Sequence, residues 1–454
     1  MDKKIFTVLL FSLVTRVIYL FFDKNIWWDA AVYLAMGEHI ATFGQLGFWE
    51  PIRPLLWPFL LSYAFLFELN PIILGHIFST FFSLGVIYLT YFIAKKLFNE
   101  QTALLSSILL SFTWIFFLFN ARLYTEIPAV FFGLCAYYFF LQEKHFETGL
   151  CIGLAFLTKF PMGILLVILG LFSIRKIKNT FYLLAGFILI TVPYFMFNYL
   201  AYGSPIEILF FAQEFLKYAG IWIFQEPWWW YLFALIKENV LFFFAIPGTV
   251  FAIYKKRYSL VAIFLLILIY LSQMDHKELR FTILLLPFIA IIAAYGYQKI
   301  FKENFSFIVI VFLLFSIPLS VEDPITNEYF KYFEEKQTTG EILVTHPLTG
   351  YYAHKNVTIM YYPWFNASQA DYWKDYIEKK NPEYISLDSC EGGFLCPPDD
   401  DHCEEKKQEL IKEIEEKYTT VFNETRGVCT YQIYQFNFSF SSQTQNTSDR
   451  NILL

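Results

Sequence analysis

The segment 275–280, with the sequence DHKELR, holds five ionisable side chains between two apolar runs. Ionisable groups kept at the edge of a bilayer commonly mark a reaction or transport path. His276, Lys277 and Arg280 could bind phosphate, and the forked guanidinium fits a phosphate through two parallel hydrogen bonds. The alternative is a solvated loop, in which these cations form weak surface salt bridges with Glu278 and its neighbouring aspartate.

Three other charged residues also stand where chemistry is possible. Asp29 precedes a run with helical spacing over 29–42, so it is either a candidate general base or the N-cap of that helix. Glu126 stands where an apolar span begins, and a carboxylate there also favours the helix dipole. Lys159 interrupts the apolar stretch 148–172. It therefore needs an anionic partner, either a protein carboxylate or a bound phosphate.

The elements that position these residues are membrane spans. Of the 454 residues, 57% are hydrophobic, 21% are aromatic and only 16% are charged. Soluble domains of ordinary composition carry about 25% charged residues. The candidate spans are Ile5–Phe22, Ile72–Ala94, Ala103–Phe119, Ile127–Leu141, Thr180–Leu200, Trp230–Tyr254, Leu260–Leu271, Phe281–Tyr297 and Phe305–Ser320. The composition predicts a polytopic α-helical membrane protein, with no nucleic-acid partner.

The basic residues predict the topology. Clusters near residues 3, 95, 144, 175, 255 and 299 all belong on the cytoplasmic side by the positive-inside rule. Lys144 and Arg175 share that side only if the stretch 148–172 enters the membrane and returns, with Lys159 at its tip. Each arm is too short to cross about 30 Å of hydrocarbon. The sequence therefore predicts about 11 membrane segments, including one short buried hairpin, with a cytoplasmic N-terminus.

The polar region after residue 320 is then extracytoplasmic. Alternating helical and strand patterns predict a small α/β domain over 321–436, followed by a disordered tail over 437–454. This leaves 1–320 as the membrane domain, whose first outer loop, 23–71, carries surface helices. The outer domain contains four cysteines that suit two disulfides in an oxidising compartment: Cys390, Cys396, Cys403 and Cys429. Of three possible connectivities, we expect Cys390–Cys396 with Cys403–Cys429.

Four short motifs lie on the predicted outer face. Residues 276–281, HKELRF, match an H-K-E-x-R-F signature, and residues 28–33 read WDAAVY. Residues 122–128 read RLYTEIP, and residues 153–159 read GLAFLTK. Together they resemble motifs of the GT-C-type integral membrane glycosyltransferases that use polyprenyl-phosphate sugars. The first motif is typical of dolichyl-phosphate-mannose mannosyltransferases. The W-W-D-Y-G signature of oligosaccharyltransferases is absent, and Ala30 stands where many relatives carry a second acid.

The resemblance implies a GT-C-like fold over 1–320 and an inverting single-displacement transfer. A sugar, mannose being favoured, would pass from a polyprenyl- or dolichyl-phosphate donor to a glycan, lipid or protein acceptor on the extracytoplasmic face. Asp29 would be the general base and Glu126 a second catalytic acid. Residues implied to bind substrate are Tyr33, Arg53, Lys159, His276, Lys277, Glu278 and Arg280.

Neither a metal nor another cofactor is required by this chemistry. A divalent metal is possible, but no ligand spacing in the sequence indicates one. Outward-facing cysteines and polyprenyl-phosphate chemistry favour an archaeal plasma membrane, and the endoplasmic reticulum comes next. The rival interpretation is a lipid or glycan transporter or flippase, which would also keep buried charges. Such proteins commonly show internal repeats, and the sequence has no convincing repeat.

Overall fold

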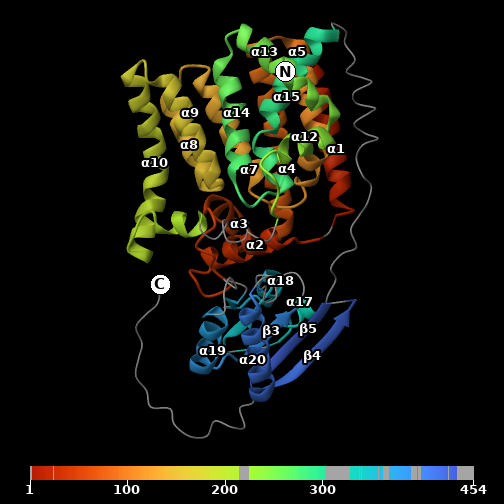
Figure 1. Cartoon of the computed structure of the whole chain (residues 1–454), viewed down its shortest axis with the longest axis vertical. Helices are drawn as coiled ribbons and strands as arrows, with labels where there is room; N and C mark the ends of the chain where they lie inside the picture. The colour runs from red at the N-terminus through yellow and green to blue at the C-terminus, as the bar shows by residue number, and fades with distance from the viewer. Residues whose placement is uncertain are drawn as a thin grey trace. The chain divides into compact units, whose positions relative to one another are not determined.

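The computed structural model describes residues 3–23, 25–213, 224–301, 328–336, 338, 340–355, 357–360, 368–389, 396, 400–427 and 429–436. The chain forms two compact units (Figure 1). The first comprises residues 1–24, 52–57 and 72–323, and the second comprises residues 25–51, 58–71 and 324–454. The predicted span Phe305–Ser320 and the predicted tail lie outside the described residues.

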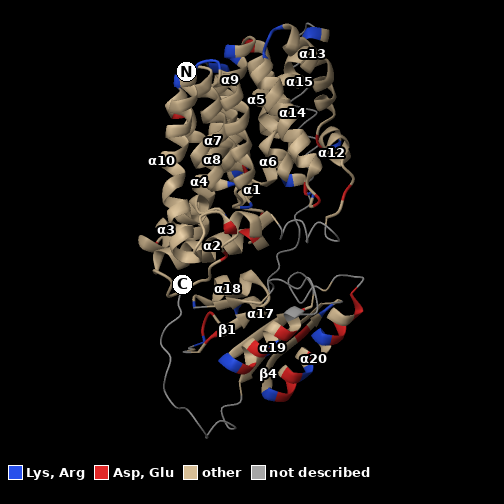
Figure 2. Ribbon diagram, turned by 60° about the vertical axis from the view of Figure 1, so that its left-hand side comes forward, with Lys and Arg blue, Asp and Glu red and all other residues tan. Residues whose placement is uncertain are grey.

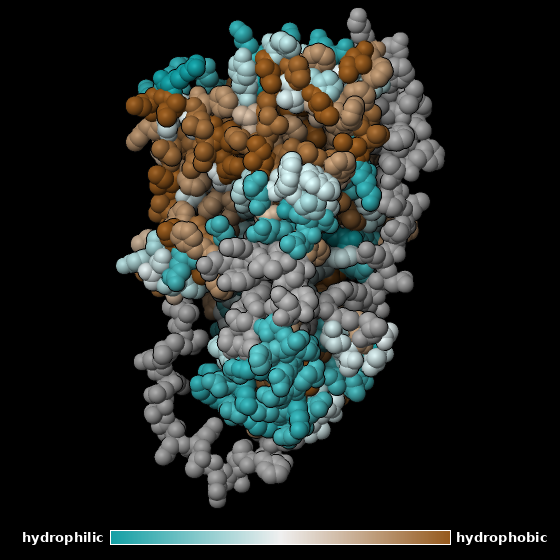
Figure 3. Space-filling model, in the orientation of Figure 1, coloured by the Kyte–Doolittle hydropathy of each residue, from teal (hydrophilic) through white to brown (hydrophobic). Residues whose placement is uncertain are grey.

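The first unit is a bundle of apolar helices that follow the predicted spans. Its helices are α1 (Lys3–Leu20), α4 (Pro71–Leu97), α5 (Glu100–Phe112), α6 (Trp114–Leu118), α7 (Glu126–Phe140), α8 (His145–Thr158), η1 (Phe160–Gly163), α9 (Ile164–Ser173), α10 (Ile177–Tyr202), α12 (Trp230–Glu238), η2 (Val240–Phe244), α13 (Ala245–Tyr254), α14 (Tyr258–Gln273), η3 (Leu279–Leu284) and α15 (Leu286–Phe301). Among the described helices, α4 and α10 are individually long and apolar enough to cross a membrane. Apolar side chains cover much of the bundle's visible face (Figure 3).

One end of the bundle gathers basic residues, as the positive-inside rule requires (Figure 2). Lys4 at the start of α1 lies 2.8 Å from the Glu100 carboxylate, and Lys95 at the end of α4 lies 3.6 Å from it. Arg257, which follows α13, donates a hydrogen bond of 2.9 Å to the carbonyl of Leu97. These contacts bring three of the predicted cytoplasmic clusters together. The hydroxyl of Tyr137, near the end of α7, lies 3.0 Å from the hydroxyl of Ser259, two residues after Arg257, so Glu126 at the start of α7 lies towards the other end of the bundle.

The stretch around Lys159 turns back on itself, in the way the predicted hairpin requires. Helices α8 and α10 run parallel and very close: a Cβ atom at Gly149 would lie 2.0 Å from the Leu183 carbonyl oxygen, and one at Gly153 would lie 2.8 Å from Ile190. The chain must therefore return through α9 before α10 begins. At about 1.5 Å per residue, α8 is roughly 21 Å long and α9 roughly 15 Å, so each arm is shorter than about 30 Å of hydrocarbon.

A helix break and a buried arginine, neither anticipated from the sequence, lie inside the bundle. The backbone leaves the helical conformation at Thr113, between α5 and α6. Arg16 of α1 is 1% exposed and donates to the Ser83 hydroxyl (2.9 Å) and to the Ser111 carbonyl (3.1 Å) at the end of α5. The Glu238 carboxylate accepts from the backbone N–H of Ile115 (3.1 Å) at the start of α6. The arginine thus stabilises the carbonyl end of α5, and the glutamate stabilises the N–H end of α6.

We expect the substitution Arg16→Leu to destabilise the bundle. The change removes hydrogen bonds from a charged donor, each worth about 1.5–3 kcal/mol, and leaves a buried carbonyl without its partner. The apparent melting temperature of the purified protein in detergent should fall by several degrees. Arg175→Leu, which removes an exposed arginine, is the matched control. Equal melting temperatures for the two variants would contradict a stabilising role for Arg16.

The second unit contains a five-stranded mixed sheet in the order β2-β1-β3-β5-β4. Its strands are β1 (Ile342–Val344), β2 (Val357–Ile359), β3 (Tyr384–Asp388), β4 (Tyr418–Arg426) and β5 (Cys429–Phe436). Strand β1 pairs in parallel with β2 and β3, while β5 pairs antiparallel with β3 and β4. The helices of this region are α17 (Glu328–Lys331), α18 (Pro347–Ala353), α19 (Ser368–Lys380) and α20 (Asp401–Lys417). Apolar residues of α19 and α20 form a core with the sheet, in agreement with the predicted α/β domain.

The first outer loop contributes α2 (Trp28–Ala41) and most of α3 (Leu56–Leu66) to this second unit. We expected α2 to be an amphipathic helix on the membrane surface, but every residue from Asp29 to Glu38 is buried. Helix α3 approaches α2 so closely that a Cβ atom at Gly37 would lie 3.2 Å from the Pro58 carbonyl oxygen. Packing on more than one side therefore replaces the one-sided burial that the apolar spacing suggested.

The cysteines lie in the region predicted to hold disulfides, but the expected pairing is wrong. Cys396 is bonded to Cys403, seven residues further along the chain, rather than to Cys390. Cys429 is also disulfide-bonded, and Cys390 lies outside the described residues. The error has a simple cause, because spacing alone cannot select one of three connectivities.

Candidate functional site

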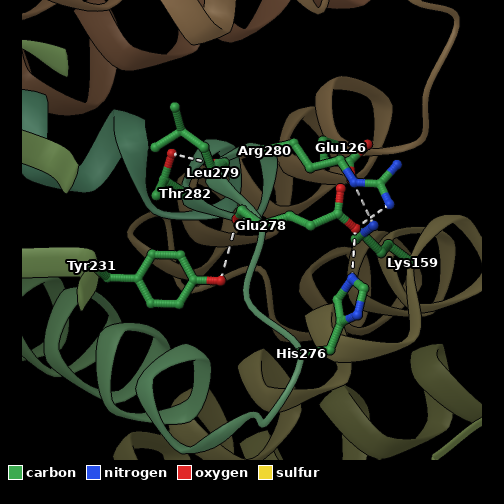
Figure 4. Close-up of polar contacts among 8 residues, drawn as sticks. All are labelled: Glu126, Lys159, Tyr231, His276, Glu278, Leu279, Arg280 and Thr282. Carbon is green, nitrogen blue, oxygen red and sulfur yellow. Dashed lines mark hydrogen bonds and ion pairs between the residues drawn. The ribbon is translucent and has the colours of Figure 1, made fainter. Parts of the chain in front are cut away.

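Five charged or titratable side chains meet inside the first unit, and we call them the ionic cluster: Glu126, Lys159, His276, Glu278 and Arg280 (Figure 4). Glu126 begins α7, and Lys159 stands at the turn between α8 and η1. The other three come from the segment that connects α14 to η3 and from η3 itself. Three separate stretches of sequence therefore supply the cluster.

Glu126 binds both full cations of the cluster. Its Oε1 atom lies 2.7 Å from Lys159 Nζ and 3.8 Å from Arg280 Nε. The Glu126 side chain is only 1% exposed, and its Oε2 atom has no hydrogen-bond partner among the described residues. The partner that Lys159 requires is therefore a protein carboxylate, which was one of the two alternatives left open by the sequence. A buried carboxylate oxygen without a partner is costly, so Oε2 is suited to accept a hydrogen bond from a bound hydroxyl.

Glu278 is the second acid of the cluster. Its Oε1 atom accepts a hydrogen bond from Arg280 Nη2 and lies 2.7 Å from His276 Nε2. Because a carboxylate accepts hydrogen bonds, His276 carries a proton on Nε2. The buried Nδ1 atom of His276 has no hydrogen-bond partner in the described part of the chain. It can therefore accept a hydrogen bond from a ligand, or donate one when the ring is protonated.

Aromatic rings border the cations of the cluster. The Arg280 guanidinium lies 4.9 Å from the Tyr124 ring centroid, and Lys159 Nζ lies 5.0 Å from that of Phe281. Tyr231 donates a hydrogen bond of 3.2 Å to the Glu278 backbone carbonyl. Rings stabilise desolvated cations through their negative faces. Sequence reasoning missed these contacts, although Tyr124 and Phe281 stand inside motifs that it singled out.

Lys277, which was predicted to bind substrate, makes its contacts outside the ionic cluster. Its ammonium donates to the Met274 carbonyl, and its backbone N–H donates to the Phe224 carbonyl (3.0 Å). Burial lowers the pKa of Lys277 below its usual value, while the charge of Asp275 opposes this shift. The neighbouring Asp275 is exposed, which agrees with a loop residue that takes no part in the cluster.

The remaining predicted site residues lie near the start of the chain. Asp29 and Tyr33 are buried one helical turn apart in α2, within the second unit. Asp29 is not the N-cap of this helix, since the helix begins at Trp28 and its cap residue is Trp27. Arg53 is partly buried in the loop before α3 and belongs to the first unit.

The described part of the chain contains no cluster of side chains suited to hold a metal ion. No group of three or more histidine, cysteine, aspartate or glutamate side chains is close enough there to hold an ion. Within the ionic cluster, both carboxylates already bind cationic side chains. Cation pairs can stabilise a phosphate without a metal, so the cluster's donors suit an anion better than a cation.

Comparison with known proteins supports the same class of protein. Residues 53–197 match the family model described as dolichyl-phosphate-mannose-protein mannosyltransferase. An uncharacterised protein of Aquifex aeolicus (strain VF5) is 26% identical over 246 residues, which are 52% of this chain and 58% of that protein. The chain thus spans a little over half the length of this curated relative.

Two solved structures share the fold at low sequence identity. ArnT from Cupriavidus metallidurans bound to undecaprenyl phosphate has a TM-score of 0.66 and 12% identity, covering 96% of this chain and 99% of that chain. The Archaeoglobus fulgidus oligosaccharyltransferase tethered to an acceptor peptide has a TM-score of 0.61 and 14% identity, covering 86% of this chain and 69% of that chain. The family match is confined to residues 53–197, about a third of the chain, and the two solved structures show that the chain shares their fold.

Proposed function

We propose that the chain transfers a sugar, with mannose favoured, from a polyprenyl-phosphate donor to an acceptor on the extracytoplasmic face of a membrane. The observation that carries this proposal is the partly buried ionic cluster, in which Lys159 and Arg280 are held close to the same buried carboxylate oxygen. Cations largely withdrawn from water act strongly on a phosphate because the surrounding dielectric is low. The matched family is described by its dolichyl-phosphate-mannose donor, and the similar ArnT structure is bound to undecaprenyl phosphate.

The reaction proposed is a single displacement with inversion. The acceptor hydroxyl oxygen forms a bond to the anomeric carbon while the bond from that carbon to the phosphate oxygen breaks. Asp29 takes the hydroxyl proton as general base. The departing lipid phosphate gains negative charge, which Lys159, Arg280 and His276 stabilise.

The two acids of the ionic cluster have supporting roles in this scheme. Glu126 and Glu278 hold the cations in place, and the Glu126 Oε2 atom accepts a hydrogen bond from a sugar hydroxyl. Tyr33, which lies one turn after Asp29, and Arg53 help to bind the substrates. The Lys277 ammonium bonds a backbone carbonyl, so we assign it a part in holding the loop rather than in binding phosphate.

The proposed orientation places the N-terminus in the cytoplasm and the sheet-containing domain outside. The gathering of basic residues at one end of the bundle and the Cys396–Cys403 disulfide both support this orientation. An archaeal plasma membrane suits these features best, as the sequence suggested.

Turnover of a labelled donor tests the proposed function. Purified protein in proteoliposomes should consume radiolabelled polyprenyl-phosphate mannose faster than polyprenyl-phosphate glucose and release polyprenyl phosphate. A short mannoside, a serine- and threonine-containing peptide and a glycolipid represent the three acceptor classes. The labelled product identifies the acceptor class. Movement of either donor across the bilayer without its consumption would instead favour the flippase alternative.

A further inference from the structure

The helix that carries Asp29 is held at both ends by histidines of the sheet-containing domain. At its first residue, the Trp28 ring packs against His346, with centroids 4.6 Å apart and ring planes at 68°. His346 stands two residues after the end of β1 and caps α18, since its Nδ1 atom accepts a hydrogen bond of 3.1 Å from the backbone N–H of Leu348. The His346 ring is 1% exposed and also packs against Phe330 at 4.6 Å. The hydrogen bond to Leu348 and the contact with Phe330 thus fix the His346 ring, and the fixed ring contacts Trp28 of α2.

The other end of α2 is held by an ion pair. His354, which follows α18, lies with Nδ1 2.8 Å from Oε1 of Glu38. The Glu38 side chain is only 5% exposed, and its Oε2 atom has no hydrogen-bond partner among the residues described. A buried carboxylate depends strongly on its single cationic partner. Trp28 and Glu38 are about 15 Å apart along the helix, so the two histidines hold separate ends.

Two further contacts lie beyond the end of α2. The Gly47 carbonyl accepts a hydrogen bond of 3.3 Å from the backbone N–H of Val357, at the start of β2. Phe48 packs on Gly350 of α18 so closely that a Cβ atom at Gly350 would lie 2.9 Å from its ring. Residues at the two ends of α18 and at the start of β2 therefore contact both ends of α2 and the loop that follows it. All these residues belong to the second unit.

We propose that His346 and His354 are positioning residues, through which the sheet-containing domain fixes the orientation of the Asp29 helix for transfer. The proposal rests on the proposed function, because Asp29 is assigned there as the general base. It goes beyond that assignment by giving the outer domain a defined part in the reaction. Catalysis depends on the placement of the base to within a fraction of an ångström, and a helix held at one end only would not keep Asp29 so well placed.

Conservative substitutions separate positioning from folding. His346→Asn keeps an acceptor for the N-cap of α18 and removes the ring from Trp28. His354→Gln keeps a hydrogen-bond donor for Glu38 and removes the positive charge. His402→Gln is the matched control, since His402 is an 85% exposed histidine of the same domain. Each full-length variant is compared by hydrogen exchange of the α2 amides and by kcat and KM for polyprenyl-phosphate mannose.

We expect His354→Gln to increase exchange in α2 by about tenfold, as the loss of a charge-assisted contact implies. His346→Asn, which loses the ring contact with Trp28, should increase it by about three- to tenfold. The kcat value should fall by about the same factor, with KM for the donor unchanged. Unchanged exchange in α2 would overturn the positioning role of the two histidines, whether or not Asp29 is the general base. Faster exchange with unchanged kcat would also overturn it. A transfer-competent Asp29→Asn protein would instead overturn the proposed base, because the exchange measurement does not depend on activity.

The His354 contact also predicts a pH dependence of α2 protection. The hydrogen bond to Glu38 and the charges of Glu38 and Glu334 raise the pKa of His354, while burial and Lys355 act in the opposite direction. A histidine whose folded pKa is raised stabilises the structure below its unfolded pKa of about 6.5. That stabilisation is lost as pH rises through the folded pKa. Exchange protection factors of α2 should therefore fall over this range in the unmodified protein and stay flat in His354→Gln; equal slopes would contradict the charged contact.

Discussion

Asp29→Asn is expected to insert and fold normally and to transfer no detectable sugar. Asparagine has the same shape as aspartate, so the buried environment of residue 29 keeps its packing. It cannot accept the acceptor's proton, and loss of a general base commonly lowers the rate by about 10²–10⁴-fold. The measurement is the initial rate of label transfer from polyprenyl-phosphate mannose in proteoliposomes, normalised to folded protein.

The matched control for this prediction is Asp375→Asn. Asp375 is an exposed carboxylate of α19, with a side-chain exposure of 68%, and its loss should leave the transfer rate within about twofold of the unmodified protein. Full transfer by Asp29→Asn would remove Asp29 from the base role. A parallel loss in both variants would point to a general effect of carboxylate removal instead.

Arg280→Lys is expected to lower kcat by about 10²–10³-fold, which is the usual cost of losing one preorganised donor to a developing negative charge. Lysine keeps the positive charge but loses the fork that binds two oxygens at once. It also loses the flat face that lies 4.9 Å from the Tyr124 ring. Arg280 is proposed to stabilise negative charge that develops on the phosphate only as the bond breaks. The KM for the donor should therefore change much less than kcat.

Arg426→Lys provides the comparison for Arg280. Arg426 of β4 forms an exposed pair with Glu424, and exposed pairs contribute little to stability. The melting temperature of Arg280→Lys must also be measured, since Glu126 and Glu278 remain buried beside it. A kcat within twofold of the unmodified protein, at an equal folded fraction, would show that Arg280 only neutralises these carboxylates.

The turn of the chain at Lys159 could be predicted because two constraints act on the same stretch. The positive-inside rule assigns Lys144 and Arg175 to one side, and the stretch between them is too short to cross a membrane twice. Strand β4, by contrast, has little signal in the sequence. Its residues alternate weakly and are mostly exposed on both faces, since it lies at the edge of the described sheet, next to β5. A pattern of one-sided burial, on which strand prediction depends, is absent there.

The members of the ionic cluster could be identified from the sequence, but their pairings could not. The charged motifs identified Glu126, Lys159 and the 276–280 segment, because buried charge is rare enough to be informative. Their partners are set by tertiary packing: Lys159 and Glu126 are 33 residues apart in the chain. Tyr231 lay inside the predicted span Trp230–Tyr254 without being singled out, and its hydrogen bond to Glu278 spans 47 residues. Local sequence carries no signal for contacts of that separation.

The charges of the ionic cluster have a consequence for how a phosphate enters it. Glu126 and Glu278 offset the full positive charges of Lys159 and Arg280, so the two cations can remain buried without a ligand. Under the proposed function, the donor phosphate would meet cations that already have carboxylate partners. It would compete with the Glu278 oxygen that accepts a hydrogen bond from the Arg280 guanidinium. Donor binding would then be a counter-ion exchange, in which the lipid phosphate takes the place of one of the protein's own carboxylates.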